Sequence, residues 1–339
     1  MIIKFKENRV RRAYYGGKRI DRFYGKVGED GRYPEEWLAS AVEAFNPDMP
    51  KAGEGLSVTD DGTVFRELLK KDADTLLGER EMSILVKLLD SAERLVIQCH
   101  PTVEFAKKRM NSVFGKTECW YILDADDNAH VYLGFKEGIT REHWERLFAD
   151  QDVNGMLNCL HKFHVSSGDL WFVAGGVPHA IGGGAFMIEL QEPSDLMVIP
   201  ERTTPSGVVL AEQKLHSGLG FDGMFDVYDY TGLSEAETRA LYFRHPERMI
   251  NTPVEIVGEE LTNKFSMVRF TVDGKVDFNL GNRYAVAVVT DGEGSIKTCD
   301  GNLKVKKSDS LFVSFGTDTV RLQGKFEIVF SISKEQTAM

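Results

Sequence analysis

The chain has 339 residues, 42% of them hydrophobic and 27% charged, and its formal net charge is −11. A chain of this length can bury a large core, in one elongated or two compact domains. The negative charge argues against partners such as the nucleic acid backbone or an anionic membrane surface. A few local Lys or Arg residues would still allow the protein to bind a small phosphate.

The four cysteines form no CxxC pair, which indicates reduced thiols in a cytosolic protein. The first eight residues carry charges where a secretory signal would be apolar. No apolar run approaches the ~20 residues that a membrane-spanning helix needs. We therefore expect a soluble, cytoplasmic protein.

The N-terminal part predicts a mixture of strands and helices. Basic and aromatic residues alternate over residues 1–30, which is typical of edge strands and turns at a surface. Residues 34–40 predict a turn or helix start that leads into a strand. Two helices are expected, at residues 63–69 and 79–90. In the second, Met82, Leu85, Leu88 and Leu89 recur at helical spacing, and Lys87 lies near its end.

The middle of the chain alternates between strands and helices. Strands are expected at residues 118–123, 130–135, 161–165, 170–173 and 186–191. Helices are expected at 142–149, 153–160, 221–230 and 234–241. Thr140 precedes the first of these helices as a cap, and Ser234 has Glu237 at capping-box distance.

From about residue 252 the pattern indicates strands and turns alone. Short apolar runs at 254–256, 265–272, 284–290, 311–315 and 326–332 are separated by Asp-Gly pairs at 273–274, 291–292 and 300–301, as in a β-sandwich or barrel. Residues 307–313 also resemble residues 167–173, but no histidine follows them. The sequence therefore predicts a mainly β protein of two related barrels, with a metal site in the first alone.

Four polar residues suggest that metal site. Gln98 and His100 are two residues apart, so on a strand both point to the same face. Glu118 begins another strand, and His179 follows a Gly-Gly/Pro turn. Nitrogen and oxygen ligands of this kind suit a borderline divalent metal and can leave a position open for substrate.

Several motifs together resemble the type I mannose-6-phosphate isomerases, and most closely their shorter bacterial members. They are Ile97-Gln98-x-His100-Pro101, the Gly-Lys-Thr-Glu-x-Trp-Tyr run at 115–121, Pro178-His179-Ala180-Ile181-Gly182 and Gln191-x-x-Ser194-Asp195. These isomerases are zinc-dependent members of the cupin superfamily. The resemblance implies two cupin-type (jelly-roll) β-barrels with helical insertions: a metal-binding domain at 1–245 and a metal-free, cupin-like β domain at 246–339.

The resemblance also implies ligands and an activity. One Zn²⁺ per chain would be held by Gln98, His100, Glu118 and His179. The expected reaction interconverts mannose 6-phosphate and fructose 6-phosphate through an enediol, so the partner would be a small phosphosugar. Matching the family residue by residue places Lys116, Lys87 and Asp195 around the sugar, without deciding which of them is the base.

The sequence departs from the family at two positions. The family has an arginine four residues after Asp195, where it helps stabilise the anionic intermediate, and here that position is Ile199. Arg202 lies three residues further on, and we expect it to take this catalytic role only if a bulge near Pro200 turns it inward. Many relatives have a lysine where this chain has Ser206. Ser57, Arg202 and the N-terminal arginines are weaker candidates for phosphate binding.

Two alternatives follow from these departures. Ile199 favours a non-catalytic or altered-specificity protein that binds a sugar phosphate. Another metal cupin, such as an iron oxygenase, is less well supported, because a site of two His and one carboxylate would leave Gln98 as an unexplained fourth ligand. The sequence does not indicate the oligomeric state.

Overall fold

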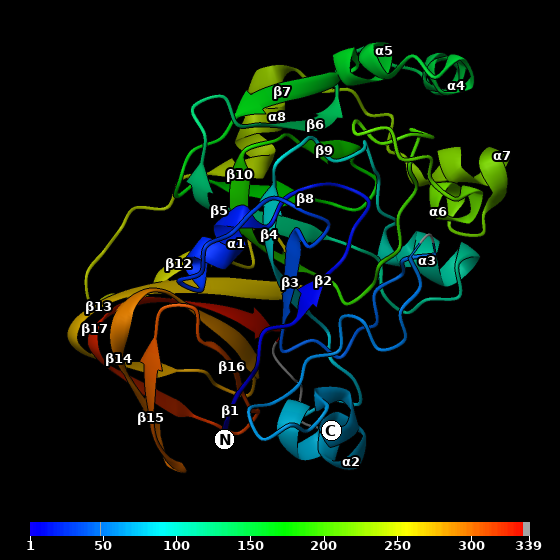
Figure 1. Ribbon diagram of the computed structural model, residues 1–339. Coiled ribbons are helices and arrows are strands. Elements are labelled where there is room, and N and C mark those ends of the chain that lie inside the picture. Colours follow the sequence, from blue (N-terminus) through cyan, green and yellow to red (C-terminus); the bar gives the residue numbers. More distant parts are fainter. Residues whose placement is uncertain (48, 335–339) are drawn as a thin grey trace.

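The computed structural model describes residues 1–47 and 49–334 (Figure 1). A seven-stranded antiparallel sheet lies in the middle of the molecule and carries most of the site. Its strands, in spatial order, are β11 (Phe243–Arg244), β8 (Leu170–Val173), β5 (Glu118–Ala125), β10 (Ala185–Gln191), β4 (Leu85–Ser91), β3 (Glu35–Leu38) and β2 (Arg9–Val10).

Two further sheets flank the central one. The smaller contains β7 (Leu160–His164), β6 (His130–Phe135) and β9 (His179–Ile181). The C-terminal sheet, yellow to red in Figure 1 apart from the blue β1, has the order β1 (Ile2–Lys4), β16 (Ser310–Val313), β14 (Ala285–Thr298), β17 (Thr319–Ser333), β13 (Phe265–Asn279) and β12 (Val254–Val257), with β15 (Gly301–Lys306) paired to β14. Among the described residues, no path of paired strands closes on itself.

The helices lie between and around the sheets. They are α1 (Lys18–Phe23), α2 (Phe65–Leu77), α3 (Val103–Arg109), α4 (Arg141–Asp150), α5 (Val153–Asn158), α6 (Glu212–His216), α7 (Gly220–Met224), α8 (Glu235–Tyr242) and the 3₁₀ helix η1 (Phe225–Val227). The expected caps form: Thr140 accepts a hydrogen bond from the His143 N–H, and Ser234 and Glu237 make a capping box. No helix in the described part of the chain is long and apolar enough to cross a membrane.

The prediction of a mainly β protein is confirmed, but the helix expected at residues 79–90 is wrong. Leu85–Ser91 is the strand β4, which pairs with β3 on one side and β10 on the other. Every residue of β4 is buried. A strand covered on both faces has a continuous apolar run instead of an alternation, and such a run does not distinguish a strand from a helix. Lys87 therefore lies on a central strand.

Two other local predictions are also corrected. Residues 18–23 form the helix α1, and Arg12 and Tyr14, placed at the surface by the sequence pattern, are buried. Asp300-Gly301 does lie at the turn between β14 and β15, but residues 273–274 and 291–292 lie inside β13 and β14. Gly274 and Gly292 have φ values of 109° and 73°, so these positions use glycine within long strands.

The resemblance between residues 167–173 and 307–313 has a structural counterpart. Asp169, before β8, accepts a hydrogen bond from the Ser166 N–H at 2.8 Å, and Asp309, before β16, accepts one from the Lys306 N–H at 3.0 Å. Gly168 and Ser308, one residue earlier, both have left-handed φ values, 91° and 75°. The two turns are thus built alike.

One hydrophobic cluster joins the central and C-terminal sheets. It includes Leu88 and Ile188 from the central sheet and Met267 and Phe312 from the C-terminal sheet. The first strand, β1, also pairs with β16. Residues from both ends of the chain therefore share a sheet and a core, and a domain boundary at residues 245/246 stays a prediction.

Candidate active site

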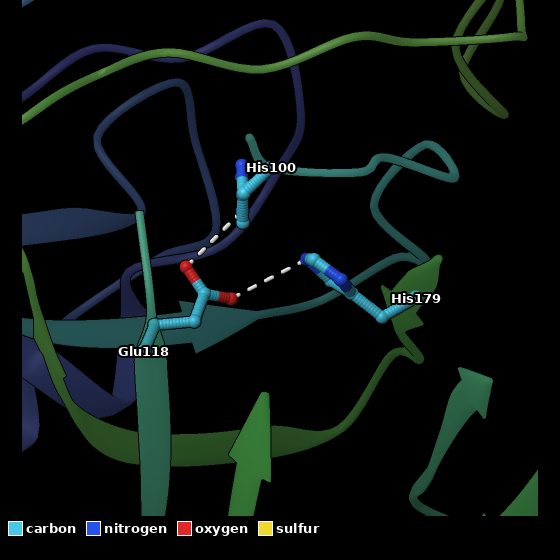
Figure 2. Close-up of side chains that lie close together, drawn as sticks. All are labelled: His100, Glu118 and His179. Atoms are coloured by element: carbon cyan, nitrogen blue, oxygen red, sulfur yellow. Dashed lines mark ion pairs between the residues drawn. The ribbon is translucent and has the colours of Figure 1, made fainter. Parts of the chain in front are cut away.

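Three buried side chains converge between the central and the three-stranded sheets (Figure 2). Glu118 is the first residue of β5, His179 is the first residue of β9, and His100 follows Cys99, which bridges to Val198. The Glu118 carboxylate lies between the two imidazoles: Oε2 is 3.1 Å from His100 Nε2, and Oε1 is 3.3 Å from His179 Nε2.

Backbone carbonyls determine the form of both histidines. His100 Nδ1 lies 2.9 Å from the Leu196 carbonyl oxygen, and His179 Nδ1 lies 2.8 Å from that of Val177. A carbonyl only accepts hydrogen bonds, so each Nδ1 carries the proton and each Nε2 presents a lone pair to Glu118. His179 Nε2 has no hydrogen-bond partner in the described part of the chain.

Burial keeps these histidines neutral. It lowers the pKa of His179 to about 3 and also lowers the pKa of His100. Burial alone would raise the pKa of Glu118, but the charge of Lys116 and the contact with His100 hold it well below its usual range. Two neutral imidazoles and an ionised carboxylate, each histidine fixed by a carbonyl, fit a divalent metal ion.

Lys116 and Gln98 adjoin this cluster. The Lys116 Nζ lies 2.7 Å from both His100 Nε2 and Glu118 Oε2, so in this structure a lysine ammonium supplies the positive charge beside the ligand atoms. Gln98 forms an antiparallel bridge to His179 through two backbone hydrogen bonds of 2.9 Å. The predicted fourth ligand therefore lies next to His179, and its metal-binding role stays a prediction.

A cavity opens beside the cluster, and Gln98 and Lys116 are part of its wall. Among the described residues, four cationic side chains line it: Arg12, Lys87, Lys116 and Lys214. The carboxylates Glu35, Glu189 and Asp195 line it as well. The apolar part of the wall includes Leu89, Ile199 and Leu210. An ordinary small-molecule site has this mixture of apolar wall and converging polar groups.

Lys87 is held in the cavity by sheet register. It lies opposite Glu189 across the β4–β10 pair, and its Nζ is 3.0 Å from Glu189 Oε2. Burial alone would lower the pKa of Lys87, but the charges of Glu189 and Glu35 outweigh it and raise that pKa. The site therefore contains a buried ammonium that stays charged.

Arg12 joins two of the cavity carboxylates. Its Nε lies 3.0 Å from Glu35, and its Nη1 and Nη2 lie 3.2 and 3.4 Å from the two oxygens of Asp195. Burial opposes ionisation of both acids, yet the charges of Arg12 and Lys87 lower the pKa of Glu35 to about 2 and that of Asp195 well below its usual range.

Sequence reasoning missed Glu35, Glu189 and Lys214, and it considered the N-terminal arginines only as weak candidates for phosphate binding. The interpretation of residues 1–30 as a surface did not place Arg12 in the site. Glu35 and Glu189 lie on strands whose neighbours carry predicted site residues, so the register of the central sheet was the missing signal. The register follows from long-range pairing, which the local sequence does not specify.

Arg202 and Ser57 lie outside this site. The Arg202 guanidinium lies 4.9 Å from the Phe148 ring centroid and 5.2 Å from that of Phe221, and the residue is exposed. The predicted inward turn of Arg202 is therefore not found. The Ser57 hydroxyl donates to the Trp37 carbonyl at 3.0 Å and so supports the backbone.

Comparison with known proteins first defines the class. Residues 259–333 match the family model described as mannose-6-phosphate isomerase, cupin domain. Residues 259–333 therefore resemble a cupin domain, and the His/Glu cluster lies in the preceding part of the chain.

The similarity to mannose-6-phosphate isomerases extends over nearly the full length of the chain. The mannose-6-phosphate isomerase of Streptococcus mutans is 25% identical, with 98% of both chains covered. The solved mannose 6-phosphate isomerase from Bacillus subtilis has a TM-score of 0.77 at 22% identity and covers 97% of this chain and 99% of its own. A mannose 6-phosphate isomerase bound with zinc and yttrium has a TM-score of 0.73 at 14% identity, with 99% and 100% covered. The predicted resemblance to type I mannose-6-phosphate isomerases is confirmed.

Proposed function

We propose that this protein is a zinc-dependent isomerase that interconverts mannose 6-phosphate and fructose 6-phosphate. The observation that carries the proposal is the position of Lys116, which contacts His100 and Glu118 and also lines the cavity. A metal-type cluster and a cavity rich in cations therefore form one site. The names of the relatives support the same reaction.

The metal-binding residues of this proposal are His100, Glu118, His179 and Gln98, which would hold one Zn²⁺ per chain. When bound there, zinc would act as a Lewis acid toward oxygen atoms of the sugar. Three protein ligands of the buried cluster come from separate segments, so the folded chain presents a prearranged set of donors. The solved relative bound with zinc and yttrium agrees with this choice of metal.

The cavity suits a phosphosugar. Among the described residues its wall carries four cationic side chains, which can attract an anionic ligand even though the chain as a whole is acidic. The apolar wall of Leu89, Ile199 and Leu210 can pack against a sugar face. Lys214 of α6, together with Thr204, provides polar groups on the loop side of the cavity, where a phosphate can bind.

The reaction moves one proton from C2 to C1 and one from O2 to O1, and it redistributes the bonding electrons within the sugar. A base takes the proton from C2 of the aldose while O1 gains a proton, which gives the enediol; a proton then returns to C1 while O2 loses its proton, which gives the ketose. This step requires a proton acceptor close to the carbon and stabilisation of the negative oxygen. The proton acceptor is one of Lys116, Lys87 and Asp195, all of which line the cavity.

A second candidate is a protein that binds the sugar phosphate without turning it over. The observation in its favour is Ile199, which is 1% exposed and places an apolar side chain in the cavity wall. Both candidates predict a small phosphosugar ligand and a cytoplasmic location, and they differ only in chemistry.

The test is a coupled assay of fructose 6-phosphate formation from mannose 6-phosphate, run on zinc-loaded and chelator-treated protein. We expect turnover by the loaded protein alone, and none with unphosphorylated mannose at the same concentration. Binding of mannose 6-phosphate without turnover would favour the second candidate. Absence of both binding and turnover would overturn both.

A further inference from the structure

Arg12 is the least expected member of the cavity wall. It is 5% exposed and follows the edge strand β2, whereas its neighbour Arg11 turns away and bonds to Glu54 at 2.9 Å. Arg12 lies over the Trp37 ring, 5.2 Å from its centroid, and Lys87 lies at the same distance from that centroid. Two buried cations therefore flank one indole beside the cavity.

The contacts of Arg12 fix its orientation and leave one donor unused. A guanidinium has five N–H donors. Glu35 takes the donor on Nε, Asp195 takes one on each terminal nitrogen, and Asn46 takes the second on Nη1 at 3.4 Å. In the described part of the chain, this leaves one N–H of Nη2 for a ligand in the cavity.

The position of Asp195 places Arg12 near the metal end of the cavity. The residue after Asp195 is Leu196, whose carbonyl accepts the His100 Nδ1–H at 2.9 Å. Arg12, Asp195 and the backbone that orients a predicted metal ligand are thus joined by direct contacts.

We infer that Arg12 is a catalytic residue that contacts the sugar at its reacting end and stabilises the negative charge of the enediolate. This inference rests on the proposed isomerase function. A cation held in place by two carboxylates needs no reorganisation when charge develops, which is the condition for effective transition-state stabilisation.

The affinities for two inert ligands distinguish a contact of Arg12 with the reacting end of the sugar from a contact with the phosphate. An aldonate 6-phosphate carries a carboxylate at the reacting end, and an alditol 6-phosphate carries no charge there. Calorimetry on zinc-loaded protein measures the affinity for each, and the coupled assay measures kcat. The matched variants are Arg12→Met, Arg12→Lys and the neighbouring control Arg11→Met, each checked by circular dichroism and metal content.

We expect Arg12→Met to weaken aldonate phosphate binding by about 30-fold, as for a lost charge-assisted hydrogen bond, and to leave alditol phosphate binding almost unchanged. The kcat should fall by about 100-fold or more. Arg12→Lys should give a smaller loss in both, and Arg11→Met should behave like the wild type. If Arg12→Met does not fold, the test is made with Arg12→Lys: its loss of affinity should be larger for the aldonate phosphate than for the alditol phosphate.

Equal losses for both ligands would overturn the inference, since they would place Arg12 at the phosphate. Unchanged affinities in a folded Arg12 variant would also overturn it. A wild type that binds aldonate phosphate through Arg12 but shows no turnover would instead refute the isomerase proposal, while the contact itself would stand.

Discussion

The two histidines of the site show how one backbone contact per residue determines chemistry. Each Nδ1–H donates a hydrogen bond to a backbone carbonyl oxygen. Each Nε2 therefore has a lone pair that can bind a cation or accept a hydrogen bond. His179 Nε2 is buried and has no such partner among the described residues, so a metal ion would satisfy its lone pair.

We therefore predict that His179→Ala abolishes stoichiometric zinc binding, because it removes one of the converging lone pairs and leaves Glu118 with one imidazole. Metal analysis after dialysis against zinc-free buffer measures this loss. The matched control is His164→Ala: His164 is exposed and contacts the Asp127 carbonyl at 2.9 Å, away from the cluster. Equal zinc contents in the two variants would contradict the predicted metal centre.

Two adjacent glutamates of β3 show how the two faces of one strand differ. Glu35 lies in the cavity among cations, and its pKa falls to about 2. Glu36 is 1% exposed on the other face, where it accepts the Asn8 N–H at 2.5 Å. Burial raises the pKa of Glu36 to about 8, although Asn8 and Arg9 oppose this shift.

Glu36 should make the protein less stable as pH rises from about 4.5 to 8. The folded state keeps a proton that the unfolded state releases, so its contribution is complete below pH 4.5 and is lost as pH approaches 8. The expected slope in this window is about 1.4 kcal/mol per pH unit.

Urea unfolding of the wild type and of Glu36→Gln across this range tests the prediction. The glutamine cannot ionise, so its advantage over the wild type should grow with pH. The difference between the two proteins removes the contribution of the titratable groups that they share. Parallel stability curves would show that Glu36 is ionised in the folded state.

Single residues also show how far the sequence could predict the site. Gln98, His100, Glu118 and His179 stand in short motifs with characteristic neighbours, so their convergence could be expected, and the structure brings the three His/Glu members together. Arg12 has no such neighbours. Its burial depends on Glu35 and Asp195, which are 23 and 183 positions away, and local alternation cannot reveal partners at that distance.

At the scale of elements, some were easier to predict than β4. The strand at 130–135 alternates in part between buried and half-buried residues, and a cap identified the helix α4. The strand at 170–173 was also found, although all of its residues are buried. β4 is buried on both faces, and its apolar residues fit a helix equally well. For the turns before β8 and β16, in contrast, local sequence was informative: the similarity between residues 167–173 and 307–313 correctly indicated a shared turn structure.

These two turns predict opposite responses to substitution. Gly168→Ala should lower the free energy of unfolding by about 1–2 kcal/mol, since φ is 91° there. The added Cβ would also meet His245 Cε1 at 3.3 Å. Ser308→Gly, with φ of 75°, should lose no stability because it relieves the same strain. Urea midpoints at unchanged m-values measure both, and a neutral Gly168→Ala would contradict the role of the left-handed turn.

At the scale of the whole molecule, the C-terminal sheet is tied to the part that carries the site. Phe312 of β16 is fully buried in the cluster that contains Leu88 and Ile188, the neighbours of Lys87 and Glu189 on β4 and β10. Arg269 of β13 donates to the Tyr121 hydroxyl on β5, the strand that begins with Glu118. The C-terminal sheet therefore supports the strands from which the site projects.

This shared core predicts that the two parts unfold together. All four tryptophans, Trp37, Trp120, Trp144 and Trp171, precede residue 245, so their fluorescence reports on the site-bearing part alone. Far-UV circular dichroism reports on both parts. We expect both signals to give one urea midpoint in the wild type. Phe312→Ala should cost about 3–5 kcal/mol and shift both midpoints equally, although it lies in the other sheet. If Phe312→Ala left the urea midpoint of the tryptophan fluorescence unchanged, the two parts would be independent domains.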